Sequence, residues 1–277
     1  MPGLVLEDLT WVEARTAIDS GMPVVIPVGA AAKEHGPHLP LRTDATVAAA
    51  LARRVAAVLP VLVAPVVPFG YYPAFVRFAG SQCLSAATFG AVVRELCEGL
   101  AAQGATRIAI INTGHSTESP INVAVAELHR AGGARVVAAH LRFLGRSADS
   151  WLDDPQGGHA DERETSVMLA LDSRAVRMDR LPDRAANQDS DRDALPAGFA
   201  RPLVLSWSQD AGAADELSPT GSFGDATRAT AYKGEKIVAA IVADLVDGLR
   251  HAFPDAPGFR DQVSGIGDQK DGISSDT

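Results

Sequence analysis

Short, strongly apolar runs alternate along this chain with longer segments of helical periodicity, and this alternation restricts the available folds more than any other feature. The apolar runs cover residues 23–29, 61–68, 107–112 and 135–140. They are too apolar to be half exposed, which is typical of strands in a parallel sheet covered by helices on both faces. The pattern predicts a single-domain, three-layer α/β fold with a mainly parallel sheet flanked by helices.

Helices are predicted between and after these runs, at residues 10–20, 45–58, 86–103, 120–132 and 235–251, with another through residues 167–171. Thr10 and Glu13 have capping-box spacing at the first of them. Residues 179–212 show weak periodicity and are expected to be irregular. We expect one domain over residues 1–257 and a mobile, glycine- and aspartate-rich tail over residues 258–277.

The charge balance favours a small-molecule or peptide substrate. The 277 residues carry a net charge of −9, so nucleic acid and anionic membranes would not be attracted. No apolar run reaches the roughly 18–20 residues that span a bilayer, and the start lacks a signal-peptide pattern, so we expect a cytoplasmic protein. Two cysteines without a C-x-x-C pair argue against a disulfide framework and a cysteine zinc site.

A polar segment, residues 33–44, directly follows the first apolar run. It supplies two carboxylates and two imidazoles, from Glu34, His35, His38 and Asp44. Such groups are ligands for zinc or manganese, and open α/β sheets bind ligands at the carboxyl ends of their strands, where this segment begins. Taken alone, the segment would be interpreted more simply as a polar surface loop.

Two further polar loops follow later apolar runs, at residues 115–118 and 159–164. In a doubly wound sheet such loops converge on one edge. The three loops together hold four of the seven histidines in the chain, so chance clustering is a poor explanation. A hydrolytic metal centre needs this combination: ligands for one or two ions, a nucleophilic water and a group that moves protons.

Five motifs run in order across residues 24–245 of the chain. They are H-G-P-H-L-P at 35–40 with Asp44, F-G at 69–70 through F-A-G-S at 78–81, N-T-G-H at 112–115, H-A-D-E-R-E-T-S at 159–166, and G-D-A-T-R-A-T-A-Y-K-G at 224–234. This set resembles the creatininase (creatinine amidohydrolase) family. The resemblance implies a creatininase-like fold, hydrolysis of an amide-type bond, a homo-hexamer, and two divalent ions, zinc or manganese with iron as a further option.

Carried over residue by residue, the resemblance implies roles for five side chains. His35 matches a histidine ligand, Asp44 the carboxylate that bridges the ions, and His115 a ligand to the other ion. Glu162 matches the glutamate of H-A-G-E in many members and is assigned as a ligand, while His159 matches the histidine that assists proton transfer. Glu162 also lies three residues after His159 near a predicted helix start, a spacing that would place both side chains on one face.

The chain departs from the family pattern in the first loop. The family reads T-E-Q-H-G-P-H, whereas residues 32–35 here read A-K-E-H. Neighbours on an extended backbone point to opposite sides, so Glu34 and His35 share a metal site only if the loop bulges. One extra alanine after Gly29 permits that bulge, and Glu34 is assigned as a ligand. Lys33 occupies the position at which the family motif has its glutamate. Instead of a metal ligand at this position, the chain would have a lysine that contacts a substrate carboxylate or oxyanion.

The second departure is Glu118, which falls three residues after His115, where creatininase has a glutamate two residues after its histidine. Creatininase specificity therefore does not carry over. We expect Glu118 to face the substrate or to hydrogen-bond a ligand. His38 is expected to hold the loop through a backbone hydrogen bond, and Glu164 either caps a helix or supports a ligand.

The leading hypothesis is a metal-dependent amidohydrolase acting on a small cyclic amide, a formamide or a short peptide. Two ions would activate the water and His159 would deliver a proton. The alternatives are a ring-opening hydrolase or isomerase of a keto-sugar or inositol-derived substrate, and a catalytically silent, metal-binding oligomer scaffold. Three aromatic residues, Tyr71, Tyr72 and Phe75, are expected to line the pocket.

Overall fold

The structure, a computed structural model, describes residues 2–155, 158–182 and 220–259. Within these ranges the sheet has five parallel strands in the order β1-β3-β2-β4-β5. They are β1 (Leu4–Val5), β2 (Val24–Val28), β3 (Leu62–Val63), β4 (Arg107–Asn112) and β5 (Arg135–His140). The predicted α/β fold with a parallel sheet is confirmed.

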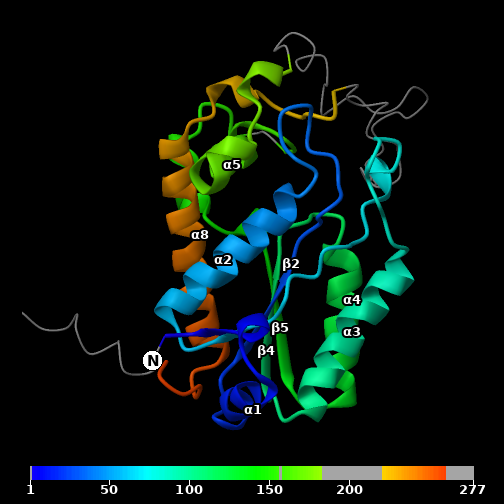
Figure 1. The fold of residues 1–277 in the computed structure, drawn as a ribbon, viewed down its shortest axis with the longest axis vertical. Helices are drawn as coiled ribbons and strands as arrows, with labels where there is room; N and C mark the ends of the chain where they lie inside the picture. Colours follow the sequence, from blue (N-terminus) through cyan, green and yellow to red (C-terminus); the bar gives the residue numbers. More distant parts are fainter. Residues whose placement is uncertain (1, 156–157, 183–219, 260–277) are drawn as a thin grey trace, which may run out of the picture.

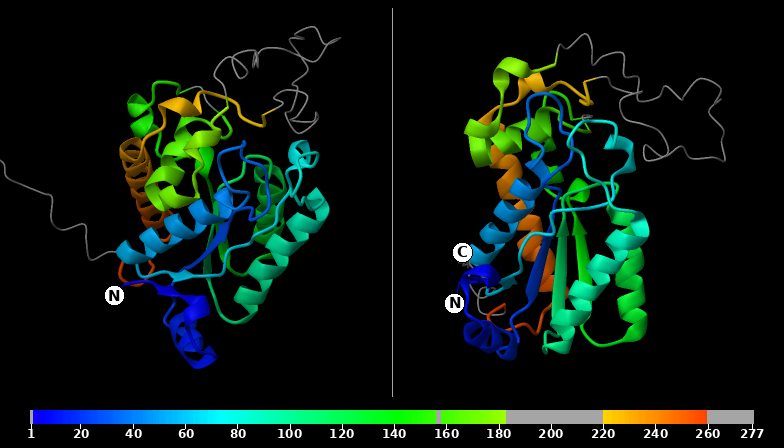
Figure 2. Two further views of the ribbon diagram at one scale, coloured as in Figure 1. Left: turned by 45° about the horizontal axis from the view of Figure 1, so that its top comes forward. Right: turned by 45° about the vertical axis from the view of Figure 1, so that its right-hand side comes forward.

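Helices cover both faces of this sheet, which gives the three layers visible in Figures 1 and 2. One face carries α2 (Thr43–Val58), α5 (Glu162–Asp172) and α8 (Ala231–Ala252), and the other carries α3 (Ala86–Ala102) and α4 (Glu118–Ala131), while α1 (Trp11–Asp19) lies below the sheet in Figure 1. The 3-10 helices are η1 (Leu6–Asp8), η2 (Pro73–Phe75), η3 (Leu141–Phe143), η4 (Arg146–Trp151), η5 (Ser173–Ala175), η6 (Met178–Arg180) and η8 (Ala226–Arg228).

Alternation along the central strands sends neighbouring side chains into two separate cores. Val24 of β2 lies in the core with α3 and α4, whereas Val25 lies in the core with α2 and α8. Ile110 and Ile111 of β4 divide in the same way. All four side chains are at most 1% exposed, which is why apolar residues stand at successive positions of these strands rather than at every second one.

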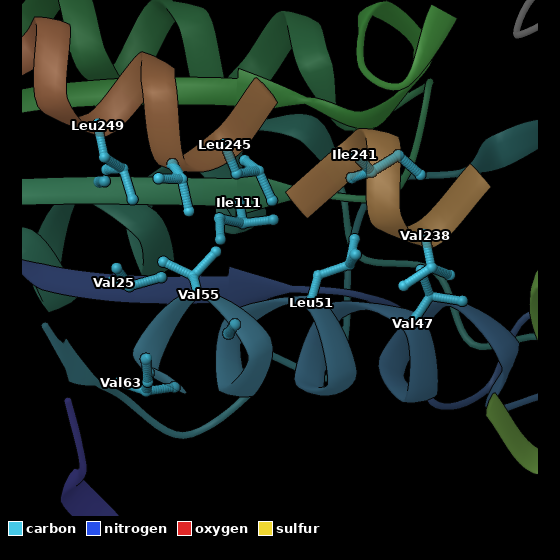
Figure 3. Close-up of a cluster of buried hydrophobic side chains, with 14 of the residues drawn as sticks. Val25, Val47, Leu51, Val55, Val63, Ile111, Val238, Ile241, Leu245 and Leu249 are labelled. Atoms are coloured by element: carbon cyan, nitrogen blue, oxygen red, sulfur yellow. The ribbon is translucent and has the colours of Figure 1, made fainter. Parts of the chain in front are cut away.

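Side chains spaced three or four residues apart build the core between α2 and α8. Figure 3 shows Val47, Leu51 and Val55 of α2 on the side that faces Ile241 and Leu245 of α8. This spacing places side chains on one face of a helix. The packing fixes α2, whose first turn carries Asp44 of the candidate site.

The predicted elements agree with the structure closely for the helices and less well for one strand. Thr10 caps α1 in a capping box with Glu13, as predicted. Of residues 61–68, only Leu62–Val63 pair as a strand, because two prolines in this run lack the backbone N–H that would continue the ladder.

Parts of the sequence prediction fall outside the described residues. They include most of the expected irregular segment at residues 179–212 and nearly all of the expected tail at residues 258–277. Among the helices that the structure describes, none combines the length and the apolar character needed to cross a membrane.

Gly234 lies at a close approach of α8 to α5. A Cβ atom at this position would sit 1.9 Å from the carbonyl oxygen of Ser166. Gly234→Ala is therefore expected to force the helices apart and to lower the free energy of unfolding by about 1–3 kcal/mol. Gly248, on the same helix, has no described heavy atom within 4 Å of its Cβ position, so Gly248→Ala is the matched control. That control should raise the free energy of unfolding by about 0.5–1 kcal/mol, and equal effects in denaturant titrations would contradict the close approach.

Candidate metal centre

The ends of three parallel strands bring the predicted loops together. Val28 of β2 is level with Asn112 of β4, which is level with His140 of β5. The loops after these strands therefore leave the sheet at one edge, at the top of Figure 1. There they border a cavity of about 270 Å³ that the start of α5 also lines.

The eight predicted site residues divide between the wall of this cavity and the layer behind it. Five of them line the cavity: Lys33, Asp44, His115, Glu118 and His159. The other three, Glu34, His35 and Glu162, are buried outside its wall. Glu34 and His35 still contact lining residues, whereas Glu162 is engaged elsewhere.

Asp44 lies in the first turn of α2, where its carboxylate holds two basic side chains. His35 Nε2 is 3.1 Å from Oδ1, and Lys33 Nζ is 3.3 Å from Oδ2. Burial raises the pKa of Asp44, but Lys33 and His35 outweigh burial and hold that pKa well below its usual range. Burial also lowers the pKa of Lys33 and of His35, yet the nearby Asp44 charge leaves both pKa values raised. Lys33 and Asp44 therefore form a buried ion pair, with the His35 ring on the other side of the carboxylate.

Both histidines in this region turn one ring nitrogen toward a backbone carbonyl. The acceptors assign the tautomers: His35 Nδ1 donates to the Lys33 carbonyl at 3.0 Å, and His159 Nε2 donates to the Glu34 carbonyl at 3.0 Å. The opposite nitrogens, His35 Nε2 and His159 Nδ1, then carry free lone pairs. Metal-ligating histidines have this arrangement, with the second nitrogen held by a carbonyl or carboxylate.

The geometry of this cluster fits a divalent ion. Within the described part of the chain, ligand atoms of His35, His159 and Glu164 lie within 4.8 Å of one another. His35 Nε2 is fully buried and has no well-aligned hydrogen bond to any described residue, although Asp44 Oδ1 is 3.1 Å away. A buried lone pair in this state is explained by a cation beside His35 Nε2, next to Asp44 and within reach of the ligand atoms of His159 and Glu164. Imidazole and carboxylate donors suit zinc, manganese or iron.

Glu34 and His35 point to different sides of their loop, as neighbours on an extended chain do. Glu34 Oε2 accepts from His159 Nε2 at 3.1 Å, and the other carboxylate oxygen accepts from the Gly36 amide. The Glu34 carboxylate therefore lies behind His159, away from Asp44. Its assignment as a ligand stays a prediction, and the contact found is one that orients His159.

The loop after β4 is held by Asn112, whose Oδ1 accepts from Thr117 Oγ1 at 2.7 Å. This loop carries His115 and Glu118, and both contact Arg142. Arg142 Nε is 2.9 Å from Glu118 Oε2, and a second guanidinium nitrogen donates to His115 Nε2 at 3.1 Å. A guanidinium thus engages two side chains for which metal or substrate contacts were predicted.

Helix α5 begins only at Glu162, with Asp161 as its N-cap. Ala160 has a φ of 49°, so the backbone before the helix is not helical. The expectation that His159 and Glu162 share a helix face is therefore wrong. Glu164 returns to His159 instead, because its Oε2 is 3.6 Å from His159 Nδ1 while it accepts from the Ala160 amide at 2.7 Å. Glu164 thus lies at the helix start and beside His159, and its support of a ligand stays a prediction.

Glu162 faces away from this cluster and is fully buried. It accepts from the amides of Asp153 at 3.2 Å and Asp154 at 2.7 Å, and it pairs with the ammonium group of Lys233 on α8. Lys233 also pairs with Asp153 at 2.7 Å. Glu162 therefore ties the loop before α5 to α8, and its role as a ligand stays a prediction.

His38 hydrogen-bonds a side chain rather than the backbone group that was predicted. Its Nε2 is 2.8 Å from the Thr165 hydroxyl, so it pins the first loop to α5. Burial lowers the pKa of His38 to about 4, which leaves it neutral at pH 7. Of the aromatic residues, Phe75 lines the cavity, and Tyr71 and Tyr72 line a smaller one beside it.

Sequence reasoning missed Arg142 and Lys233. Arg142 follows the end of β5 by two residues, so the strand-end rule that selected the other loops would have found it. Lys233 belongs to the last matched motif, but its partner Glu162 is 71 residues away and no local spacing signals the pair.

Comparisons with known proteins show the family of this chain. The profile of the creatininase family, described as creatinine amidohydrolase, matches residues 7–249. The chain is 35% identical over 268 residues to the mycofactocin precursor peptide peptidase of Mycobacterium tuberculosis, covering 89% of this chain and 94% of that protein. It is 29% identical over 267 residues to the creatinine amidohydrolase of Pseudomonas putida, covering 89% and 96%.

Solved structures of creatininases have the same fold as this chain. A structure described as "Creatininase Mn" superposes with a TM-score of 0.73 at 26% identity, covering 91% of this chain and 99% of that one. A mutant creatininase described as "Zn-Zn type" gives a TM-score of 0.73 at 26% identity, covering 92% and 100%. The predicted family resemblance is confirmed, and the chain belongs to the creatininase family of hydrolases, which act on carbon–nitrogen bonds.

Proposed function

We propose that this chain is a metal-dependent amidohydrolase that cleaves a C–N bond in a short peptide or a small amide. One observation carries the proposal: a buried imidazole nitrogen of His35, without an aligned partner among the described residues, lies 3.1 Å from Asp44, and ligand atoms of His35, His159 and Glu164 gather within 4.8 Å of one another beside an open cavity. Family membership supports the reaction class, because relatives are named for peptide and creatinine hydrolysis.

His35, Asp44 and Glu164 would hold the divalent ion, with zinc and manganese as the first choices. When bound, such an ion polarises the scissile carbonyl and activates water for attack on it. Lys33 keeps Asp44 ionised, because its ammonium group lies 3.3 Å from the second carboxylate oxygen. Asp44 is therefore already deprotonated at neutral pH, and a metal ion that binds to it does not have to displace a proton.

His159 is the residue that we expect to move a proton to the leaving nitrogen. Its Nε2 is held by the carbonyl and the carboxylate of Glu34, at 3.0 Å and 3.1 Å, so its Nδ1 faces the cavity. A carboxylate behind an imidazole fixes the orientation of the ring and stabilises its protonated form. Glu34 thus acts through His159, and proton transfer by a residue so placed contributes typically about 10²- to 10⁴-fold in rate.

A short peptide is the substrate that the cavity favours. Arg142 and Arg146 line its wall, paired with Glu118 and Asp149 at 2.9 Å each, and a substrate carboxylate would compete with these acids for the two guanidinium groups. The greater identity to a peptide peptidase than to a creatinine amidohydrolase supports the same choice. A small cyclic amide or formamide is the second substrate class to test.

Removal of divalent ions with a chelator is expected to abolish hydrolysis, and zinc or manganese should restore it. The measurement is turnover across a panel of short peptides, lactams, formamides and keto-cyclitols, before and after chelation. Full activity in chelator would contradict the metal requirement. Turnover confined to keto-cyclitols would favour the ring-opening alternative, and no turnover together with no bound metal would favour a silent scaffold.

A further inference from the structure

We infer that this centre holds one divalent ion, and that the ammonium group of Lys33 takes the place of a second. The inference rests on the proposed function, because it concerns the same site. It replaces the two ions implied by the family resemblance with one ion and one fixed side-chain cation.

The first observation is the way in which the two oxygens of Asp44 are divided. A carboxylate that bridges two ions uses one oxygen for each. Here Oδ1 faces His35 Nε2 at 3.1 Å, which leaves it on the side where an ion fits, while Oδ2 faces Lys33 Nζ at 3.3 Å. Oδ2 is therefore already paired with the ammonium group of Lys33.

The second observation is that Lys33 is fixed in this position. The residue is 7% exposed, and its ammonium group sits 4.9 Å from the centre of the Phe75 ring as well as beside Asp44. A buried ammonium group held by a carboxylate and an aromatic face cannot leave for water without losing both partners. A divalent ion placed on Oδ2 would meet this charge at close range and be repelled by it.

The third observation concerns the two donors that a second ion would need from the loop after β4. Arg142 engages both, with Nε 2.9 Å from Glu118 Oε2 and a second nitrogen donating to His115 Nε2 at 3.1 Å. A histidine whose lone pair accepts from a guanidinium is not available as a ligand until that guanidinium moves. Lys33 thus occupies the side of Asp44 that faces away from His35, and Arg142 occupies both donors of the loop after β4.

The sequence supplies the reason for this difference from relatives. A related creatininase structure is described as "Zn-Zn type", whereas this chain has lysine in the column where the resembled motif has glutamate. One substitution both removes an oxygen ligand and adds a positive charge. In a single-ion centre, each oxygen of Asp44 still faces a positive charge. The ion supplies one of these charges and the ammonium group of Lys33 supplies the other.

The test is a count of ions in the full-length protein. The wild-type chain, saturated with manganese and then dialysed, is expected to retain about one ion per chain by plasma mass spectrometry. Its electron paramagnetic resonance spectrum should be that of isolated manganese. Lys33→Glu should raise the count to about two and give the spectrum of an exchange-coupled pair. Lys236→Glu makes the same charge change on α8, at a residue that does not line the cavity, and should leave the count at about one.

The outcomes separate the inference from the proposed function. Two ions in the wild-type chain would overturn the inference and leave a metal-dependent hydrolase standing. No retained ion would overturn the proposed function, and the inference with it. An unchanged count in a folded Lys33→Glu chain would overturn the role given to Lys33. If that variant does not fold, the wild-type count and spectrum decide the question alone.

Discussion

Asp44→Asn is expected to lose the divalent ion and turnover together. The amide is nearly the same size as the carboxylate but carries no charge, while both oxygens of Asp44 face positive or metal-binding groups at 3.1 Å and 3.3 Å. Lys33 would keep its charge in a buried site without its carboxylate partner, which disfavours a further cation beside it. Metal content and hydrolysis should both fall to background.

His159→Ala gives the contrast that makes this result interpretable. If His159 moves a proton and Asp44 holds the ion, the His159 variant should keep its ion while turnover falls by about 10²- to 10⁴-fold. Asp172→Asn is the control, because Asp172 forms an ion pair with Arg42 at 2.9 Å and does not line the cavity. Equal loss of metal from Asp44→Asn and His159→Ala would make His159 a ligand and would contradict the proton-transfer role.

The layers of the fold followed from the sequence because each depends on local pattern. Runs of consecutive apolar residues, such as residues 108–111 of β4, are buried on both faces, and only a sheet covered on both sides provides that environment. The capping box of Thr10 and Glu13 is local by nature. The strand expected over residues 61–68 was too long, because apolar character marks burial but not hydrogen-bond pairing.

The candidate site was predictable as a location and less so as a set of contacts. The rule for the carboxyl ends of parallel strands placed Asp44, His115 and His159 around one cavity. The sequence prediction made Glu34 and His35 fellow ligands on a bulged loop, and only the structure supplies the contact of Glu34 with His159. That partner lies 125 residues away in the sequence, so no local spacing could have named it.

Helix periodicity failed at the start of α5 for a physical reason. The rule that residues three apart share a face needs helical backbone on both sides, and Ala160 interrupts it with a φ of 49°. The carboxylate that returns to His159 is then Glu164 rather than Glu162. Because the backbone at Ala160 is in the left-handed region, Glu164 lies beside His159 where Glu162 was expected.

Lys233→Met and Glu164→Gln are expected to separate stability from metal binding. Lys233→Met leaves the Glu162 carboxylate fully buried with two amide donors and no cation, and breaking a buried pair in this way costs about 3–5 kcal/mol. Because the two amides remain, we expect the lower end of that range. Glu164→Gln removes a charge that faces His159 across 3.6 Å, so it should lose the ion while the unfolding free energy changes little.

Metal content and denaturant unfolding of the same preparations test this pair. Glu162→Gln should lower the unfolding free energy and keep its ion, and combining it with Lys233→Met should cost less than the sum of the two changes, because removal of both charges leaves neither one unpaired. An ion lost from Glu162→Gln but kept in Glu164→Gln would reverse the assignment. Glu162 would then be the ligand, and the contact with Lys233 would have to give way when the metal binds.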